Sequence, residues 1–376
     1  MCGIAGAVYP AGGSLTAAID TQLACQHHRG PDAAGAFARG RGAVAQNRLA
    51  VIDLEHGDPP ITSEDAEIGA VLNGEIYNFR ELRAGLVSDG HRFTTGCDTE
   101  VIAHLAEQRS AVELARSLDG MFAFAVWDAG RERLILGRDR FGKKPLHYWC
   151  SGGQLVFASE IKGVLASPVV PRQLDPAAIP AYLTFGYVPL PRTFFAGIRS
   201  LPPGHVLTFE PGGEPVLERY HAPERRRLGA AAREPSLDAA ASELRGLLEA
   251  AVKRRLSADV PVGAFLSGGI DSSAIVATMS RLTDGPVATF TIGFDDRQGY
   301  DERPCARAVA QRFGTDHHEF VVRPDAVDLV ETLVWHHDQP FGDSSAVPTY
   351  LLSQLTREHV TVALCGDGGD ELFAGY

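Results

Sequence analysis

The sequence predicts two domains of different fold class, an α+β layered domain followed by an α/β domain with a parallel sheet. Within residues 3–159, strand-like apolar runs follow one another, interrupted by neighbouring helical patches, which is typical of α+β layers. From Ser236 onward, single strands alternate with helices, as in parallel sheets with helices on both faces. The stretch between lacks apolar periodicity and contains Pro223 and Pro235. We therefore expect a linker over 216–235, between domains spanning 2–215 and 236–376.

The strands expected in the first domain are rich in Val, Ile, Leu and Phe. They are Gly3–Val8, Gly42–Asp53, Ile68–Tyr77, Met121–Asp128, Arg133–Arg138, Leu146–Cys150 and Gln154–Ser159. Three helices are expected between them, because residues typical of helix starts precede helical patches. These start signals are Asn78 with Glu81 for a helix to Leu86, Asp98 for a helix to Gln108, and Ser110 with Glu113.

The second domain begins with a helix that Ser236 caps, and its later strands and helices alternate. The expected strands are Val262–Leu266, Val287–Phe294, His318–Val322 and Val360–Cys365. The expected helices are Ser272–Leu282, Glu302–Phe313 with Gly314 as its stop, Ala326–His336 and Thr349–Glu358. Ligands of such sheets bind at the carboxyl ends of the strands.

Charge and hydropathy exclude several classes of protein. Lys and Arg number 35 against 47 Asp and Glu, a formal net charge of −12, whereas nucleic-acid-binding surfaces are normally basic. No apolar run reaches the ~18 residues of a membrane span. The N-terminus lacks the cationic start and apolar core of a signal peptide. We expect a cytoplasmic protein with neither nucleic acid nor membrane as a partner.

The six cysteines contain no C-x-x-C pair, which argues against a disulfide framework and against a structural zinc site. The histidine pairs 27/28, 317/318 and 336/337 are adjacent, so on a strand their side chains would point to opposite faces, and we expect no metal site from them. Cys2 differs from the other cysteines, because removal of Met1 places its thiol beside a free α-amine. That amine, with an ordinary pKa of ~7.7–8.0, can serve as the base for the nucleophile. A buried cysteine without a chemical role is the alternative for the M-C-G start alone.

A loop rich in glycine and serine joins a strand to a helix at residues 264–273 (A-F-L-S-G-G-I-D-S-S). Glycine N–H groups and a helix N-terminus can enclose an anion, to which Ser267, Ser272 and Ser273 can also donate. Asp271 beside a phosphate is understandable if both bind Mg²⁺. The G-x-x-x-x-G-K pattern of a Walker loop is absent. The loop resembles the pyrophosphate-binding loop of the ATP pyrophosphatases, which split ATP between its α and β phosphates and form adenylates.

A second cluster of glycines and acids, C-G-D-G-G-D-E-L-F-A-G-Y at 365–376, follows the last predicted strand. Its place at the carboxyl end of a strand suits a nucleotide and magnesium site. By itself the cluster could equally be a solvated acidic turn.

Five further motifs occur in order in the first domain. They are H-R-G-P-D at 28–32, R-L-A-V-I-D at 48–53, N-G-E-I-Y-N at 73–78, G-C-D-T-E at 96–100 and G-M-F-A-F-A at 120–125. With the M-C-G start, this set resembles the N-terminal-nucleophile glutaminase domain of the asparagine synthetase family, over nearly all of residues 2–215. The resemblance implies a layered αββα glutaminase domain followed by an ATP-pyrophosphatase domain.

The resemblance also implies catalytic roles. Cys2 would attack the side-chain amide of glutamine and form a thioester, and Asn73 with the Gly74 N–H would form the oxyanion hole. Asp367 falls where the family places an acid that is important for forming the adenylate, and it replaces the Glu of some members. Met121 would be a wall residue of the family's ammonia tunnel, or an ordinary core methionine.

Binding roles follow from the same resemblance. Arg48 suits the α-carboxylate of glutamine, with a surface ion pair as the alternative, and Asp98 suits the α-ammonium, with a helix cap as the alternative. The implied glutamine-binding residues are Arg48, Leu49, Ala50, Val51, Ile52, Asn73, Gly74, Glu75 and Asp98. The implied ATP-binding residues are Leu266, Ser267, Gly268, Gly269, Asp271, Ser272, Ile292, Cys365 (a Ser in the family) and Gly366, with Asp271 and Asp370 as ligands of Mg²⁺.

Together the domains imply a ligase that uses glutamine, aspartate and ATP: ammonia from glutamine displaces AMP from a β-aspartyl adenylate. Members of the family continue well past the motif at 365–376, with a strand, helices and a catalytic lysine. We therefore expect an incomplete second domain, in a fragment or a naturally short protein that keeps the glutaminase site. The alternatives are a relative acting on another carboxylate, a short form with glutaminase activity only, and a non-catalytic sensor, against which the nucleophile Cys2 argues. A homodimer is the assembly that we consider.

Overall fold

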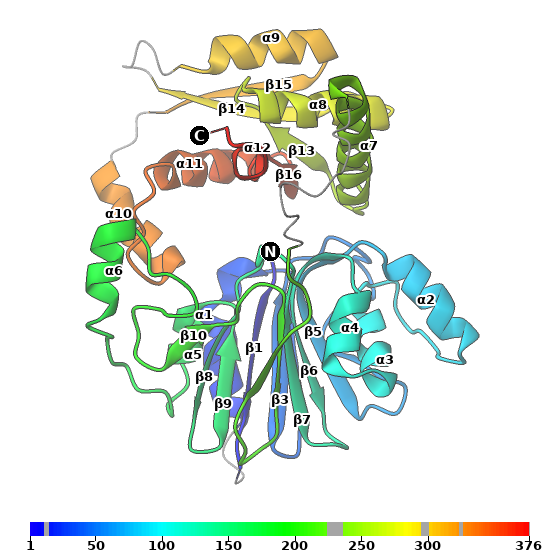
Figure 1. The fold of residues 1–376 in the computed structure, drawn as a ribbon, viewed down its shortest axis with the longest axis vertical. Helices are drawn as coiled ribbons and strands as arrows, with labels where there is room; N and C mark the ends of the chain where they lie inside the picture. The colour runs from blue at the N-terminus through cyan, green and yellow to red at the C-terminus, as the bar shows by residue number, and fades with distance from the viewer. Residues whose placement is uncertain (11–14, 224–235, 295–300, 323–325, 376) are drawn as a thin grey trace. The chain divides into compact units, whose positions relative to one another are not determined.

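The structure is a computed structural model that describes residues 1–10, 15–223, 236–294, 301–322 and 326–375. The chain forms two compact units, of which unit 1 comprises 1–225 with 334–342 and unit 2 comprises 226–333 with 343–376 (Figure 1). Helix α10 (Ala326–His337) therefore contributes its last residues to unit 1. None of the helices in the described residues is both long and apolar enough to span a bilayer.

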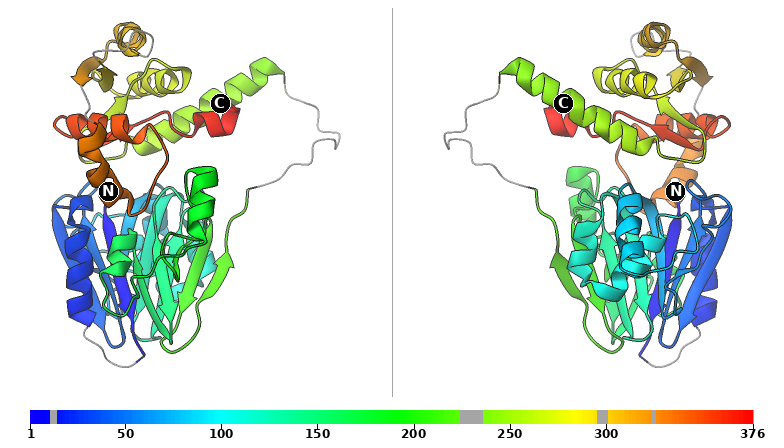
Figure 2. Two further views of the ribbon diagram at one scale, coloured as in Figure 1. Left: turned by 90° about the vertical axis from the view of Figure 1, so that its left-hand side faces the viewer. Right: turned by 90° about the vertical axis from the view of Figure 1, so that its right-hand side faces the viewer.

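Unit 1 contains two antiparallel six-stranded sheets that pack face to face (Figures 1 and 2). The first sheet has the order β10-β8-β9-β1-β3-β2 and is covered by α1 (Leu15–Cys25) and α5 (Ile161–Leu165). Its strands are β1 (Gly3–Val8), β2 (Ala33–Arg39), β3 (Gly42–Arg48), β8 (His147–Ser151), β9 (Gln154–Ala158) and β10 (Ile198–Ser200).

The second sheet has the order β12-β11-β7-β6-β5-β4, and α3 (Glu100–Gln108) and α4 (Ala111–Ser117) pack on its outer face. Helix α2 (Phe79–Ser88) packs against α3, while η1 (His27–Arg29) and α6 (Ala178–Phe185) lie in connections of unit 1. The strands are β4 (Ile61–Thr62), β5 (Ile68–Ile76), β6 (Gly120–Asp128), β7 (Arg133–Arg138), β11 (His205–Phe209) and β12 (Val216–Arg219).

The core between the two sheets contains side chains from both, including the fully buried Trp127 and Phe157. Separate apolar clusters lie between each sheet and its helices. Burial of this apolar surface is the main stabilising term of such layers. The layered αββα architecture confirms the predicted fold class.

Several local predictions for unit 1 need correction. Asn78 makes no cap, because its side chain bonds Ser117 O and Asp119 N instead. Asp98 is not a cap either, because α3 begins two residues later. The capping box of Ser110 and Glu113 is confirmed. Helix α1 and strand β2 were not predicted: the sequence of α1 has little amphipathic contrast, and β2 (A-A-G-A-F-A-R) contains no β-branched residue.

The predicted linker overlaps unit 1. Residues 216–219 form β12, which pairs with β11 at the sheet edge, so any linker begins after this strand. The strand lacks the alternation that would have marked it, because all four of its residues are exposed. Residues 224–235 of the predicted linker lie outside the described residues.

Unit 2 contains a four-stranded parallel sheet of order β15-β14-β13-β16, as the alternation of elements predicted. Its strands are β13 (Val262–Phe265), β14 (Ala288–Phe294), β15 (Asp316–Val322) and β16 (Val362–Leu364). Its helices are α7 (Leu237–Arg255), α8 (Ile270–Leu282), α9 (Arg303–Phe313), α11 (Ala346–Thr356) and α12 (Gly369–Phe373), besides most of α10. Because parallel crossovers are right-handed, α8 and α9 cover one face and α11 the other (Figure 1).

The order of this sheet reverses beside β13. The chain moves from β13 to β14 and β15 in one direction and returns to β16 on the other side of β13. Such a switch point leaves a crevice at the carboxyl ends of β13 and β16, which is where ligands of open α/β sheets bind. The loops that follow β13 and β16 are those singled out from the sequence. Helix α12, which was not predicted, begins within the second of these loops.

Candidate active site

Cys2 lies directly before β1 and is half-buried. Its Sγ accepts a hydrogen bond from Leu49 N at 3.4 Å and lies 3.7 Å from Leu49 O, and Arg29 Nε donates to Cys2 O at 3.0 Å. Burial raises the pKa of the Cys2 thiol, and the positive N-terminal amine opposes that shift. A reactive thiolate in this place therefore depends on a nearby amine.

Residues 49–53 form a loop whose backbone carbonyls accept hydrogen bonds from Arg48. The buried guanidinium donates to Ile52 O at 2.8 Å, to Asp53 O at 2.6 Å and to Asp58 Oδ1 at 2.6 Å. These contacts use three of its five N–H donors, so the buried Arg48 both fixes the loop and forms an ion pair with the exposed Asp58. The Asp32 carboxylate accepts Ala50 N at 2.9 Å, which fixes the same loop from the H-R-G-P-D motif.

Asn73, Gly74 and Glu75 lie near the end of strand β5, which runs to Ile76. Asn73 is fully buried, yet neither atom of its side-chain amide has a hydrogen-bond partner among the described residues. A buried amide without partners costs free energy unless a ligand supplies them. Gly74 has φ of 147°, and a Cβ there would lie 2.0 Å from Met121 O, so the position requires glycine. This pair can present two donors, the Asn73 amide and the Gly74 N–H, to one oxygen of a ligand.

Two carboxylates lie beside this pair. Asp98 Oδ2 accepts Ile76 N at 2.8 Å, and burial raises the pKa of Asp98 to about 6 despite such bonds. Burial and the neighbouring Asp98 raise the pKa of Glu75 well above its usual value, while Lys144 opposes that shift. The buried Asp98 and the half-buried Glu75 would be favoured in their charged forms by a further positive group, such as the ammonium of an amino-acid ligand.

A chain of buried ion pairs leads away from Cys2. Arg29 Nη1 lies 2.9 Å from Glu160 Oε1, the other oxygen of Glu160 contacts Lys162 Nζ, and Lys162 Nζ lies 2.9 Å from Asp338 Oδ1. The Asp338 carboxylate also accepts Ile161 N at 2.7 Å. Asp338 follows helix α10 and is part of unit 1, so a residue distant in the sequence completes this chain of ion pairs near Cys2.

In unit 2 the loop after β13 is closed on itself. Ser267 Oγ and Ser272 Oγ are 2.9 Å apart, and Gly269 N donates to Ser267 Oγ at 3.2 Å. Gly268 has φ of 82°, and a Cβ there would lie 2.6 Å from the backbone of α9 at Ala306. The loop leads into the N-terminus of α8, whose partial positive charge favours an anion.

The loop after β16 lies against the loop after β13. A Cβ at Gly366 would be 2.9 Å from Ser272 N, and one at Gly369 would be 2.2 Å from Asp271 Oδ2. The glycines thus permit close contact between two segments that are about 100 residues apart in sequence. The structure brings Ser267–Ser272 and Cys365–Gly369 together at the switch point of the sheet, where the sequence analysis expected a nucleotide.

The remaining predicted residues of unit 2 surround these loops. Leu266 is buried and pairs with Phe290 O, and Ile292 is half-buried farther along β14. Asp367 and Asp370 are exposed, whereas Asp271 is half-buried. Within the part of the chain that the structure describes, Asp271 and Asp370 belong to no group of three or more potential metal ligands. Two carboxylates nevertheless suit Mg²⁺, which usually takes one or two from the protein and further oxygens from phosphates and water.

Comparison with known proteins assigns a family model to each of the two parts of the chain. Residues 1–221 match the family model of a glutamine amidotransferase domain, and residues 243–376 match that of asparagine synthase. A putative glutamine-hydrolysing asparagine synthetase 2 of Methanocaldococcus jannaschii is 35% identical over 406 residues, an alignment that covers all of this chain and 76% of that protein. The chain belongs to the glutamine-hydrolysing asparagine synthetase family.

Other relatives carry the same description. Asparagine synthetase 1 of Bacillus subtilis, glutamine-hydrolysing, is 37% identical over 351 residues, which cover 93% of this chain and 54% of the Bacillus protein. A putative synthetase of Mycobacterium tuberculosis is 36% identical over 398 residues, covering all of this chain and 60% of that protein. The chain thus spans little more than half the length of these two relatives.

One residue near Cys2, Lys144, was not predicted from the sequence. Lys144 is buried and close enough to Cys2, Glu75 and Arg29 for each to affect its pKa, which burial lowers. Its loop is fixed by Asp139, which accepts the Lys144 N–H at 3.1 Å. The only signal in the sequence was the motif G-R-D-R-F-G-K-K-P at 137–145, which contains several charges and does not show which of them is buried.

Proposed function

We propose that the chain is a glutamine-dependent asparagine synthetase, with the glutaminase site in residues 2–215 and the adenylating site in residues 236–376. Glutamine, aspartate and ATP are its substrates, Mg²⁺ its metal and the cytoplasm its location. The observation that carries this proposal is the buried amide of Asn73, which has no partner among the described residues and lies next to Gly74, whose positive φ requires glycine, and near the Cys2 thiol. That combination fits a nucleophile with a preformed oxyanion hole.

In the glutaminase step, Cys2 Sγ attacks the side-chain carbonyl carbon of glutamine. Once Met1 is removed, the α-amine of Cys2 takes the thiol proton and passes it to the departing nitrogen, which leaves as ammonia. The Asn73 amide and the Gly74 N–H stabilise the tetrahedral oxyanion. Water then hydrolyses the thioester and regenerates the thiol. Asp98 binds the α-ammonium of glutamine, and the Arg48 loop binds its α-carboxylate.

In the synthetase step, the aspartate β-carboxylate attacks the α-phosphorus of ATP and pyrophosphate leaves, and ammonia then displaces AMP to give asparagine. Ser267–Gly269 and the N-terminus of α8 hold the pyrophosphate moiety, while Leu266, Ile292, Cys365 and Gly366 line the nucleotide site. Asp367 acts in adenylate formation. Asp271 and Asp370 would hold Mg²⁺, which would neutralise phosphate charge.

Glutamate release from glutamine tests the first step. We expect activity in the wild type that Cys2→Ala abolishes, while Cys25→Ala retains it, because Cys25 is another half-buried thiol of unit 1, bonded to Gln22 O. Equal glutamate release by wild type and Cys2→Ala would refute the glutaminase assignment. Mass spectrometry of the purified protein should show the loss of Met1.

Exchange of labelled pyrophosphate into ATP tests the second step. Exchange that requires aspartate and is lost in Gly268→Ala supports adenylate formation from aspartate. Exchange only with other carboxylates would assign a different acceptor. Glutaminase activity without exchange by any carboxylate would show a chain that performs only the first step.

A further inference from the structure

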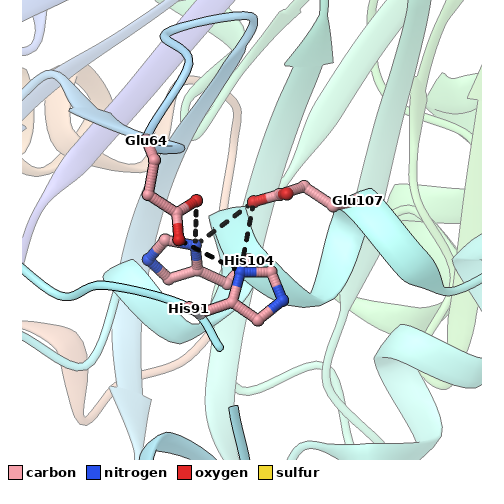
Figure 3. Close-up of side chains that lie close together, drawn as sticks. All are labelled: Glu64, His91, His104 and Glu107. Carbon is pink, nitrogen blue, oxygen red and sulfur yellow. Dashed lines mark hydrogen bonds and ion pairs between the residues drawn. The ribbon is translucent and has the colours of Figure 1, made fainter. Parts of the chain in front are cut away.

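A cluster of two histidines and two glutamates lies in unit 1, apart from the residues assigned to glutamine. Glu64 precedes β5, His91 follows α2, and His104 and Glu107 lie one turn apart on α3 (Figure 3). Three segments of the chain thus direct imidazole and carboxylate groups toward one point. In the sequence, His91 and His104 belong to no pair of adjacent histidines, so their spacing did not indicate a metal site.

The spacing of these groups matches a tetrahedral metal centre. His104 Nδ1 lies 3.2 Å from Glu64 Oε2 and 3.2 Å from Glu107 Oε1. His91 Nδ1 lies 3.2 Å from Glu64 Oε1 and 3.8 Å from Glu107 Oε1, and all four ligand atoms lie within 4.8 Å of one another. Tetrahedral ligands about 2.0–2.1 Å from a zinc ion are about 3.3–3.4 Å apart. The two histidines contact different oxygens of Glu64, so the Glu64 carboxylate must rotate and the ligand atoms must move closer together to enclose an ion.

The contacts around His104 restrict the position of its ring. The side chain of His104 is 1% exposed, and its Nε2, which has no hydrogen-bond partner, lies 3.8 Å from Glu100 Oε1. Phe93 packs against the His104 ring, with centroids 4.5 Å apart. A ligating histidine commonly directs its second nitrogen to a carboxylate, and apolar neighbours exclude water from such sites. The glutamates are partly exposed, Glu64 by 33% and Glu107 by 27%, which gives an ion access from solvent.

The charges also favour a divalent cation. Two carboxylates with two neutral imidazoles carry a charge of −2, which one divalent ion balances. Imidazole nitrogens favour zinc over Mg²⁺ and Ca²⁺, which prefer oxygen ligands. We propose that Glu64, His91, His104 and Glu107 form a tetrahedral Zn²⁺ site that fastens the segments before β5 and after α2 to helix α3.

The ion would have a structural role, since all four positions of a tetrahedral zinc are filled by protein. Glu100, beside His104, accepts hydrogen bonds from Thr94 N at 2.7 Å and Thr95 N at 2.8 Å. The site is thereby connected to the segment that leads to Asp98. The structure has hydrogen bonds between these histidines and glutamates, which a bound zinc ion would replace.

Zinc titration of the full chain, first stripped with a chelator, tests the proposal. We expect one Zn²⁺ per chain with Kd below about 1 μM. At zinc concentrations a hundredfold above Kd, the melting temperature of unit 1 should rise by about 5–10 °C. Equal concentrations of Mg²⁺ or Ca²⁺ should not change it. Cobalt in this site should give the visible bands of a tetrahedral ion without a thiolate charge-transfer band, which distinguishes it from cobalt bound to cysteine.

The double variant Glu64→Gln/Glu107→Gln keeps the size of both side chains and removes both anionic ligands. Its zinc affinity should fall by about a hundredfold or more. Its melting temperature without metal should be close to that of the stripped wild type, which shows that it folds. The matched control, His27→Ala, removes an exposed histidine elsewhere in unit 1 and should leave affinity unchanged. The proposal is overturned if the wild type binds no stoichiometric zinc, or if the double variant binds it as tightly.

Discussion

Replacing Lys162 by methionine tests whether the buried ion pairs near Cys2 stabilise unit 1. The substitution removes the ammonium and keeps most of the apolar stem. Lys162 bridges Glu160 and Asp338, and the side chains of all three are at most 9% exposed. Glu160 retains Arg29 and His28 as partners, whereas Asp338 retains the Ile161 N–H.

The magnitude follows from the geometry of the pair. At 2.9 Å and an effective dielectric constant of 20, the attraction between Lys162 and Asp338 is about 6 kcal/mol before desolvation is subtracted. Removing one partner of a buried pair typically costs about 3–5 kcal/mol. Burial already raises the pKa of Asp338 against the opposing effect of Lys162. Without the lysine, Asp338 will bind a proton more readily, so we expect a loss of about 3 kcal/mol at pH 8 and a smaller one at pH 6.

Urea unfolding, for the free energy, and thermal unfolding, for the melting temperature, measure this effect in four proteins: wild type, Lys162→Met, Asp338→Asn and the double variant. The melting temperature of Lys162→Met should fall by about 6–12 °C for a unit of this size. In the Asp338→Asn background the lysine substitution should cost at least about 2 kcal/mol less, because no carboxylate is left unpaired at that position. Lys253→Met, at an exposed lysine of unit 2, is the control and should change stability by no more than about 0.5 kcal/mol. Additivity of the two substitutions within about 0.5 kcal/mol would refute the reasoning.

Three further predictions concern the sites. Because the raised pKa of Asp98 is about 6 and only its ionised form binds an ammonium, KM for glutamine should rise up to tenfold per pH unit below pH 6; an unchanged KM down to pH 5 would contradict this. Gly74→Ala introduces a Cβ 2.0 Å from a carbonyl oxygen and should lower glutaminase kcat at least tenfold and reduce stability, measured by initial rates and thermal unfolding. Gly268→Ala, with φ of 82°, should weaken ATP binding in calorimetry while leaving glutamate release intact. Gly85→Ala, in helix α2 with no atom within 4 Å of the new Cβ, is the control for both glycine variants and should be neutral or slightly stabilising.

The sequence predicts elements well where local pattern and tertiary burial agree. Strands β1 and β7 have the bounds that their apolar runs indicated, and all four strands of unit 2 occupy the predicted places. Prediction failed where contacts distant in sequence decide the outcome. Asn78 has the right type and spacing for a cap, but its amide bonds Ser117 O and Asp119 N from the neighbouring connection.

The same limit applies to the sites. Contiguous motifs located Cys2, the loop at 49–53 and both loops of unit 2, because glycines and a strand end mark such loops locally. Nothing in the sequence indicates that Arg29 and Lys162 both pair with Glu160. Nor does it indicate that His104 contacts Glu64. Those contacts depend on how strands and helices of different segments pack, which periodicity alone does not specify.

Because residues 334–342 belong to unit 1, unit 1 cannot be isolated as one continuous piece of the chain. The chain passes from one unit to the other three times, after Arg225, after Leu333 and after Gly342. A protease nick within 226–235 would therefore leave two fragments of which the second still carries Asp338, the partner of Lys162. A recombinant unit 1 ending at Arg225 would lack that carboxylate and the Gly342 N–H that donates to Gly186 O. Adding back a peptide of residues 334–342 would be the natural complementation experiment for such a truncated protein.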